Sequence, residues 1–157
     1  MANIEIAKFE NHDGYVRSIE QYNISGIVGP GGKNEPNDVM LIKALLFLNE
    51  SNKDVSDLKY FGQSRIGLID LPEINGILDT GTIQAIWAFQ RRNASTLLST
   101  DGKIHPASYQ NRVIKKYNGA KFMSITLLNQ QAYYAPMYLD TNSLEQTIKK
   151  IAPSIRF

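Results

Sequence analysis

The strongest structural signal in the chain is Asn75-Gly-Ile-Leu-Asp-Thr-Gly-Thr-Ile-Gln-Ala-Ile-Trp-Ala-Phe-Gln90. It opens on a turn, after which Asp79 or Thr80 can cap a helix because a side-chain oxygen accepts free N–H groups of the first turn. The apolar residues that follow recur at helical spacing and predict a helix over residues 81–93. The buried stripe of this helix consists of Thr82, Ala85, Ile86 and Phe89. Gln90 is expected to bond to the backbone of a neighbouring loop.

Two further blocks flank this stretch. Asp38-Val-Met-Leu-Ile-Lys-Ala-Leu-Leu-Phe-Leu-Asn49 predicts a helix over residues 39–49, capped by its first residue, with the apolar side chains gathered on one stripe. Asp101-Gly-Lys-Ile-His-Pro-Ala-Ser108 repeats the shape of the opening turn, in which a glycine permits the bend and the apolar residue two positions later anchors the loop. Its proline fits the first turn of a third helix, over residues 106–117.

The N-terminal residues are predicted to be mostly extended. Alternation of apolar and polar residues around Ile4 and Ile6 favours a strand, and His12-Asp13-Gly14 is a turn signal, so residues 1–25 are expected to form a β-hairpin. A helix over residues 15–22 is the competing interpretation. Residues 25–37 are rich in glycine and proline and predict a loop.

The remaining segments are predicted to be mostly helical. Residues 50–75 form a long connection, with a short helix near 55–61 and an extended piece at 65–71. Further helices are expected over residues 120–134 and over 143–151, where Asn142 is a possible cap.

Composition excludes several classes of chemistry. The chain of 157 residues has a formal net charge of +2 and only short basic pairs, which does not indicate a nucleic-acid partner. It has no cysteine, so disulfides and thiolate zinc sites are excluded. Its two histidines are far apart and lack metal-ligand spacing, and no G-x-S-x-G motif is present. We expect no cofactor, no metal and, without a run of about 18 apolar residues, no membrane span.

Taken together, the three blocks resemble the peptidoglycan-binding domain of the three-helix type found beside many cell-wall hydrolases. That family reads roughly D-V-x-x-L-Q-x-x-L, then D-G-x-F-G-x-x-T-x-x-A-V-x-x-F-Q, then D-G-x-V-x-P-x-T. The span from the first block to the last, residues 38–108, covers a little under half of the chain. The chain departs from the pattern at Lys43, Asn75, Leu78 and Asp79-Thr80.

The resemblance implies a mainly α-helical fold and a non-catalytic function. The expected architecture is a three-helix bundle at residues 38–118, preceded by a short β-hairpin-like extension and loop at 1–37 and followed by extra helices at 119–157. The expected ligand is peptidoglycan or a wall-derived fragment.

A second resemblance concerns the route to the cell wall. Ser25–Val39 looks like the lead-in to such modules in bacterial proteins linked to type VI secretion and its wall-targeting effectors. The N-terminus has neither the basic nor the apolar region of a Sec signal. The expectation is therefore synthesis in the bacterial cytoplasm and delivery to the periplasm by a specialised secretion system, with a secretion-system or effector protein as a possible partner.

Six side chains are candidates for ligand contact. Trp87 can stack on a sugar or peptide if it is half exposed, although packing beneath residues 50–75 is the more common role for an aromatic residue. Arg91 can pair with a carboxylate, or simply lie on a solvated helix face. His105 either touches ligand at the loop rim or is an exposed turn residue. The other candidates are Asp79, Tyr60 and Arg65, of which the last two can line a groove or anchor the 50–75 connection.

Two other functions stay open at this point. A protein-interaction adaptor or immunity-like component on the same scaffold is one, and the cluster Tyr133, Tyr134, Met137 and Tyr138 suits a docked partner because tyrosine and methionine are enriched at interfaces. The same cluster can instead cover an apolar face of the module. A small cell-wall hydrolase with paired acidic catalysts is the third function, because only geometry decides whether two carboxylates cooperate.

Overall fold

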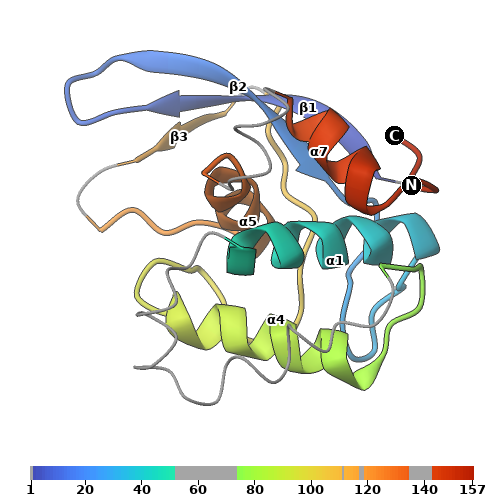
Figure 1. Cartoon of the computed structure of the whole chain (residues 1–157). Coiled ribbons are helices and arrows are strands. Elements are labelled where there is room, and N and C mark those ends of the chain that lie inside the picture. Colours follow the sequence, from blue (N-terminus) through green and yellow to red (C-terminus); the bar gives the residue numbers. More distant parts are fainter. Residues whose placement is uncertain (1, 52–73, 111, 117–118, 135–142) are drawn as a thin grey trace.

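The computed structural model describes residues 2–51, 74–110, 112–116, 119–134 and 143–157. Its elements, in chain order, are β1 (Asn3–Glu10), β2 (Val16–Asn23), α1 (Pro36–Ser51), α4 (Thr80–Arg92), β3 (Val113–Lys115), α5 (Ser124–Ala132) and α7 (Leu144–Ile151). The helix α1 lies in the middle of the molecule, with α4 on the side away from the sheet (Figure 1). The helix α5 packs between α1 and β2, and α7 also contacts α1.

The described residues form a mixed α/β fold, so the expectation of a mainly α three-helix bundle is wrong. The three strands make one mixed sheet in the order β2-β1-β3. One hydrophobic core cluster takes side chains from β2, α1, α4, α5 and α7, including Tyr22, Leu45, Phe89, Leu128 and Ile148. The sheet is therefore an integral layer of the core.

The N-terminal hairpin is confirmed. Strands β1 and β2 pair antiparallel from Asn3 opposite Asn23 to Glu10 opposite Val16. This register places Ala7 and Phe9 on the buried face, while Ile4 and Ile6 face outward. The alternation that predicts the strand therefore places its isoleucines on the exposed face, while the buried face is filled by residues of the opposite parity.

The helix expected over residues 106–117 is wrong, because none of the described residues in this range is helical and residues 113–115 form strand β3. Strand β3 pairs parallel with β1, with Val113 opposite Lys8 and Lys115 opposite Glu10. Two adjacent β-branched residues, Val113 and Ile114, suit a strand better than a helix. The backbone N–H of Lys116 also donates to Glu10 O at 2.9 Å, which extends the pairing past the strand end.

Helix α1 is buried on nearly all sides, which corrects the expectation of a single apolar stripe. Between Asp38 and Asn49 the only exposed side chain is Phe47. A helix that is apolar all round belongs in a protein interior. The helix also begins earlier than expected, at Pro36, so Asp38 lies in its first turn. The Asp38 carboxylate accepts bonds from Ser25 N, Ser25 Oγ and Gly26 N, and ties down the preceding loop.

Helix α4 agrees closely with the prediction. Asp79 is its N-cap, since Asp79 Oδ1 accepts from Thr82 N at 2.7 Å. Its buried side chains are Thr82, Ala85, Ile86, Phe89 and Gln90.

The two C-terminal helices are confirmed with shifted starts. Helix α5 begins at Ser124, because Phe122 is held extended between Thr96 O and Leu98 N. Helix α7 begins after Ser143, whose Oγ accepts from Gln146 N at 3.3 Å. The proposed cap Asn142 and the short elements predicted at 55–61 and 65–71 lie outside the described residues.

The side chain of Asn129, in α5, covers one end of the outer edge of β2. Asn129 Oδ1 accepts from Tyr22 N at 2.8 Å, and Asn129 Nδ2 donates to Tyr22 O at 2.8 Å. This amide therefore pairs with the strand edge as a neighbouring strand would. A third bond, from Asn129 Nδ2 to Ile125 O at 2.8 Å, holds the amide in place.

A membrane crossing needs a long apolar helix. None of the helices within the described residues has the required combination of length and apolar composition.

Candidate functional site

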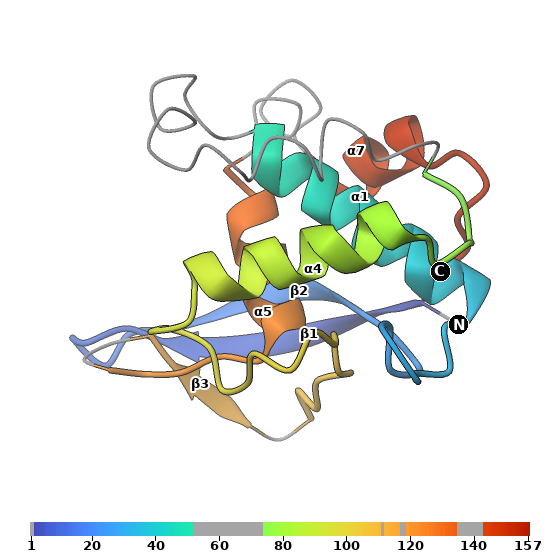
Figure 2. The ribbon, with the colours of Figure 1, turned by 90° about the horizontal axis from the view of Figure 1, so that it is seen from below.

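Two loops that are far apart in the sequence are joined beneath α4. Val28 N donates to Ile104 O at 3.0 Å, and Ile104 N donates to Val28 O at 2.8 Å. Gly29 permits this approach, because a Cβ at its position would lie 2.8 Å from Gly102 O. The glycine-rich loop therefore serves to support the turn at residues 101–105, which Figure 2 shows from below.

Gln90 fixes the same turn from the helix side. Its Oε1 accepts from Gly102 N at 2.7 Å, while its Nε2 donates to Lys103 O at 2.7 Å and to Ser124 Oγ at 3.1 Å. The side chain is fully buried. The predicted bond from Gln90 to loop backbone is thus confirmed, and it makes the turn rigid.

Trp87 lies on this rigid turn. Trp87 is 39% exposed, and a Cβ at Gly102 would fall 2.5 to 2.7 Å from three atoms of its indole ring. The ring therefore covers the glycine on one side and keeps its other side partly open. Gly102 has a φ of +75°, so both its backbone conformation and its contact with the ring favour glycine.

Polar residues lie on the same helix and the same turn as this contact between Trp87 and Gly102. His105 Nε2 lies 2.8 Å from Asp101 Oδ2, on the turn that carries Gly102. Burial would raise the pKa of Asp101, but hydrogen bonds from His105 and from Lys103 N outweigh it, so the pKa is lowered. Arg91 is exposed one helical turn beyond Trp87, on the same face of α4. We call Trp87, Arg91, Asp101, Gly102 and His105 the Trp87 surface.

Asp79 has structural partners at the other end of α4. Besides capping the helix, its Oδ2 accepts from Lys43 Nζ at 2.7 Å, and the Lys43 side chain is completely buried. Asn75 Oδ1 accepts a second bond from Lys43 Nζ at 3.0 Å. Burial would raise the pKa of Asp79, but bonds from Lys43 and Thr82 hold it below its usual value. Residues 43, 75 and 79 therefore form one hydrogen-bonded group.

Three of the six candidate residues lie on α4 or on the turn that Trp87 covers. Trp87, Arg91 and His105 belong to the Trp87 surface. Asp79 lies eight residues before Trp87 on the same helix, which is roughly 12 Å along its axis. Tyr60 and Arg65 lie outside the described residues.

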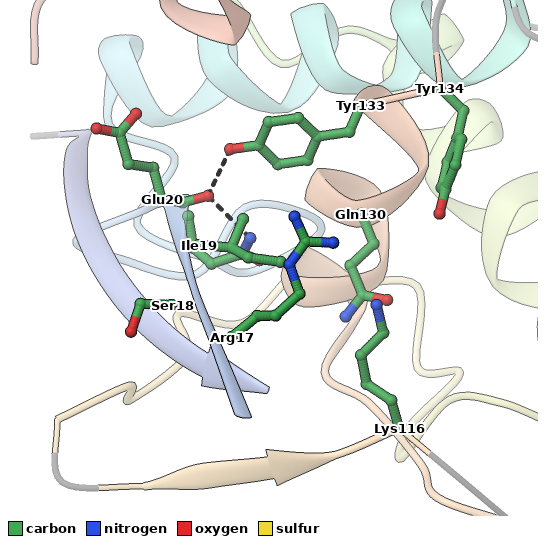
Figure 3. Close-up of a pocket in the computed structure, with 9 residues that line it drawn as sticks. Arg17, Ser18, Ile19, Glu20, Lys116, Gln130, Tyr133 and Tyr134 are labelled. Carbon is green, nitrogen blue, oxygen red and sulfur yellow. Dashed lines mark hydrogen bonds between the residues drawn. The ribbon is translucent and has the colours of Figure 1, made fainter. Parts of the chain in front are cut away.

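A second site was missed in the sequence. A cleft of about 430 Å³ lies between β2, the residue after β3 and the C-terminal end of α5, and Arg17, Lys116 and Gln130 contribute to its walls (Figure 3). Tyr133 and Tyr134, which the sequence marks as part of an aromatic cluster, also line it. Arg17 and Lys116 carry no local signal, because only the pairing of β1 with both other strands brings them close.

The function of these two sites is indicated neither by a metal-binding group among the described residues nor by a similar protein of known function. In the part of the chain that the structure describes, no group of three or more His, Cys, Asp or Glu side chains is placed to hold a metal ion. The chain matches no protein-family model, no curated protein and no solved structure.

Proposed function

We propose that this protein is a non-catalytic binding module for peptidoglycan or a wall-derived fragment, and that the Trp87 surface makes the contact. The observation that carries the proposal is the half-exposed indole seated on Gly102. A tryptophan with one side on protein and the other open to water is suited to stack on a sugar ring or a peptide. The three ordered blocks that resemble the peptidoglycan-binding family point to the same ligand class.

The support beneath Trp87 favours binding over a purely structural role. Gln90 fixes the backbone under the ring, so little conformational freedom remains to be lost when a ligand stacks on it. Arg91 adds a guanidinium on the same face, which can hold a carboxylate of a stem peptide through two parallel hydrogen bonds. Asp101 and His105 add polar groups at the rim.

Trp87→Ala is expected to weaken binding to purified sacculi by roughly tenfold or more, because a central aromatic contact commonly contributes at least about 1.4 kcal/mol. Co-sedimentation with sacculi at low salt measures the loss. Tyr15→Ala is the matched control, since Tyr15 is 62% exposed in the hairpin turn and lies outside the Trp87 surface. Circular dichroism shows whether each variant keeps its fold.

The same experiment separates the other functions. If the wild-type protein stays in the supernatant at low salt, peptidoglycan binding is wrong. Loss of turbidity of the sacculi supports a hydrolase instead, and stoichiometric co-purification with one protein partner supports an adaptor.

A further inference from the structure

The cleft between β2 and α5 has walls of two kinds. Arg17, Lys116 and Gln130 supply polar groups, while Ile19, Tyr133 and Tyr134 supply apolar and aromatic surface. Its volume of about 430 Å³ lies within the range of roughly 300–1,000 Å³ that small-molecule sites occupy. We call it the Arg17–Lys116 cleft.

Two cations converge in this cleft without a described carboxylate between them. Arg17 and Lys116 extend toward Gln130 from opposite sides (Figure 3). Glu20 is the only acid among the described lining residues, and its side chain points away from the cleft (Figure 3). Burial and the nearby Arg17 charge lower the pKa of Lys116. An anion between the two cations would relieve this repulsion.

A donor without a partner lies beside the cations. Gln130 Nε2 is buried and makes no hydrogen bond within the described part of the chain. A buried amide N–H without an acceptor destabilises the folded protein, and a ligand oxygen that accepts its hydrogen bond would remove this penalty. Lys116 Nζ is also held in position, 5.4 Å from the centre of the Phe9 ring. Three donors are thus arranged around one space.

The neighbouring strand edge suits the backbone of an extended peptide. Tyr133 OH donates to Glu20 O at 2.7 Å, so the backbone groups of Glu20 point toward the outer edge of β2. Alternate residues of an antiparallel strand present their backbone groups to the same edge, which places those of Ser18 there too. Among the described strands, β2 pairs only with β1. A short peptide can therefore bond to this edge, as in strand addition.

We propose that the Arg17–Lys116 cleft binds the C-terminal carboxylate of a short extended peptide. The carboxylate lies between Arg17 and Lys116 and accepts from Gln130, while the peptide backbone follows β2 near Ser18. The aromatic rings of Tyr133 and Tyr134 flank small apolar side chains of the peptide. Two sources offer this chemistry, namely a protein C-terminus built of L-residues and a wall stem peptide that ends in D-residues.

Four dipeptide probes test this site and distinguish the sources. They are N-acetyl-L-Ala-L-Ala and N-acetyl-D-Ala-D-Ala, each as the free acid and as the C-terminal amide, titrated into the full chain with NMR detection of amide and Arg17 side-chain shifts. The acid is expected to bind at least about tenfold more tightly than its amide, because the amide lacks the negative charge that strengthens hydrogen bonds from Arg17 and Lys116. Preference for the L-acid indicates a protein C-terminus, and preference for the D-acid indicates a wall peptide.

Variants locate the binding. Arg17→Gln and Lys116→Gln change exposed side chains and are each expected to weaken binding of the acid about tenfold or more. Lys121→Gln is the matched control, because Lys121 is exposed and does not line the cleft. Equal binding of acids and amides, no binding of any probe at millimolar concentration, or full binding by the Arg17→Gln, Lys116→Gln double variant would each overturn the proposal. Helix α4, which carries Trp87, and strand β2, which lines the cleft, lie on opposite sides of α1 (Figure 1), so Trp87→Ala is expected to leave probe binding unchanged.

Discussion

Asp79→Ala is expected to lower the free energy of unfolding by about 3–5 kcal/mol, because it leaves the buried Lys43 ammonium without its anionic partner. The same change removes the N-cap of α4. Loss of a cap typically costs about 1 kcal/mol, and the total expected for Asp79→Ala includes this cost. Urea unfolding followed by circular dichroism measures the effect at neutral pH.

Two further variants test this explanation, the first by separating charge from capping and the second as a control with an exposed ion pair. Asp79→Ser combined with Lys43→Met keeps a capping oxygen and removes both charges, so it is expected to recover most of the stability. Glu145→Ala removes an exposed i,i+4 ion pair with Lys149 and is expected to cost less than about 1 kcal/mol. Similar losses for Asp79→Ala and Glu145→Ala would show that burial of Lys43 is energetically unimportant.

Lowering the pH should also decrease the free energy of unfolding through Asp79. The pKa of Asp79 lies below its usual value of 3.8, so its ionised form stabilises the fold above that pH. This contribution is lost as the pH falls below 3.8 and through the lowered pKa of the folded state. Asp79→Asn should therefore show a smaller decrease in stability over that interval than the wild type.

Asn129→Leu is expected to lower the free energy of unfolding by about 2–5 kcal/mol, because each buried polar group left without a partner costs about 1–3 kcal/mol. The change keeps the approximate size of the side chain but removes three buried hydrogen bonds. The N–H and C=O of Tyr22 then lack partners. Thermal or urea unfolding measures the loss.

Gln146→Leu is the matched control for Asn129→Leu. It makes a comparable amide-to-leucine change at an exposed position of α7 and is expected to shift stability by less than about 0.5 kcal/mol. If Asn129→Leu is equally mild, apolar burial offsets the lost bonds, and the amide is not needed to hold the edge of β2.

The features that the sequence predicts correctly depend on local signals. The stripe Thr82, Ala85, Ile86 and Phe89 and the cap Asp79 follow from helical spacing and from short-range hydrogen bonding. The hairpin follows from alternation and a turn motif. Gly102 is predictable because it belongs to a turn motif whose shape repeats within the chain.

The features that are missed depend on contacts between distant residues. A strand of three residues, β3, has no periodicity of its own, and its pairing with Lys8–Glu10 determines that it is extended. Lys43, Asn75 and Asp79 are not adjacent in the sequence, and only the packing of α1 near α4 brings them into one hydrogen-bonded group. Arg17 and Lys116 become neighbours only through the complete sheet.

The all-round burial of α1 has a practical consequence for dissecting the protein. A fragment limited to residues 38–118 would keep α4 but remove β2, α5 and α7, which contribute to the same core cluster. Leucine and isoleucine side chains along several sides of α1 would then meet water, and exposed apolar surface of that extent promotes aggregation. The protein is therefore better handled as one cooperative unit, with ligand sites mapped by point substitutions rather than by truncation.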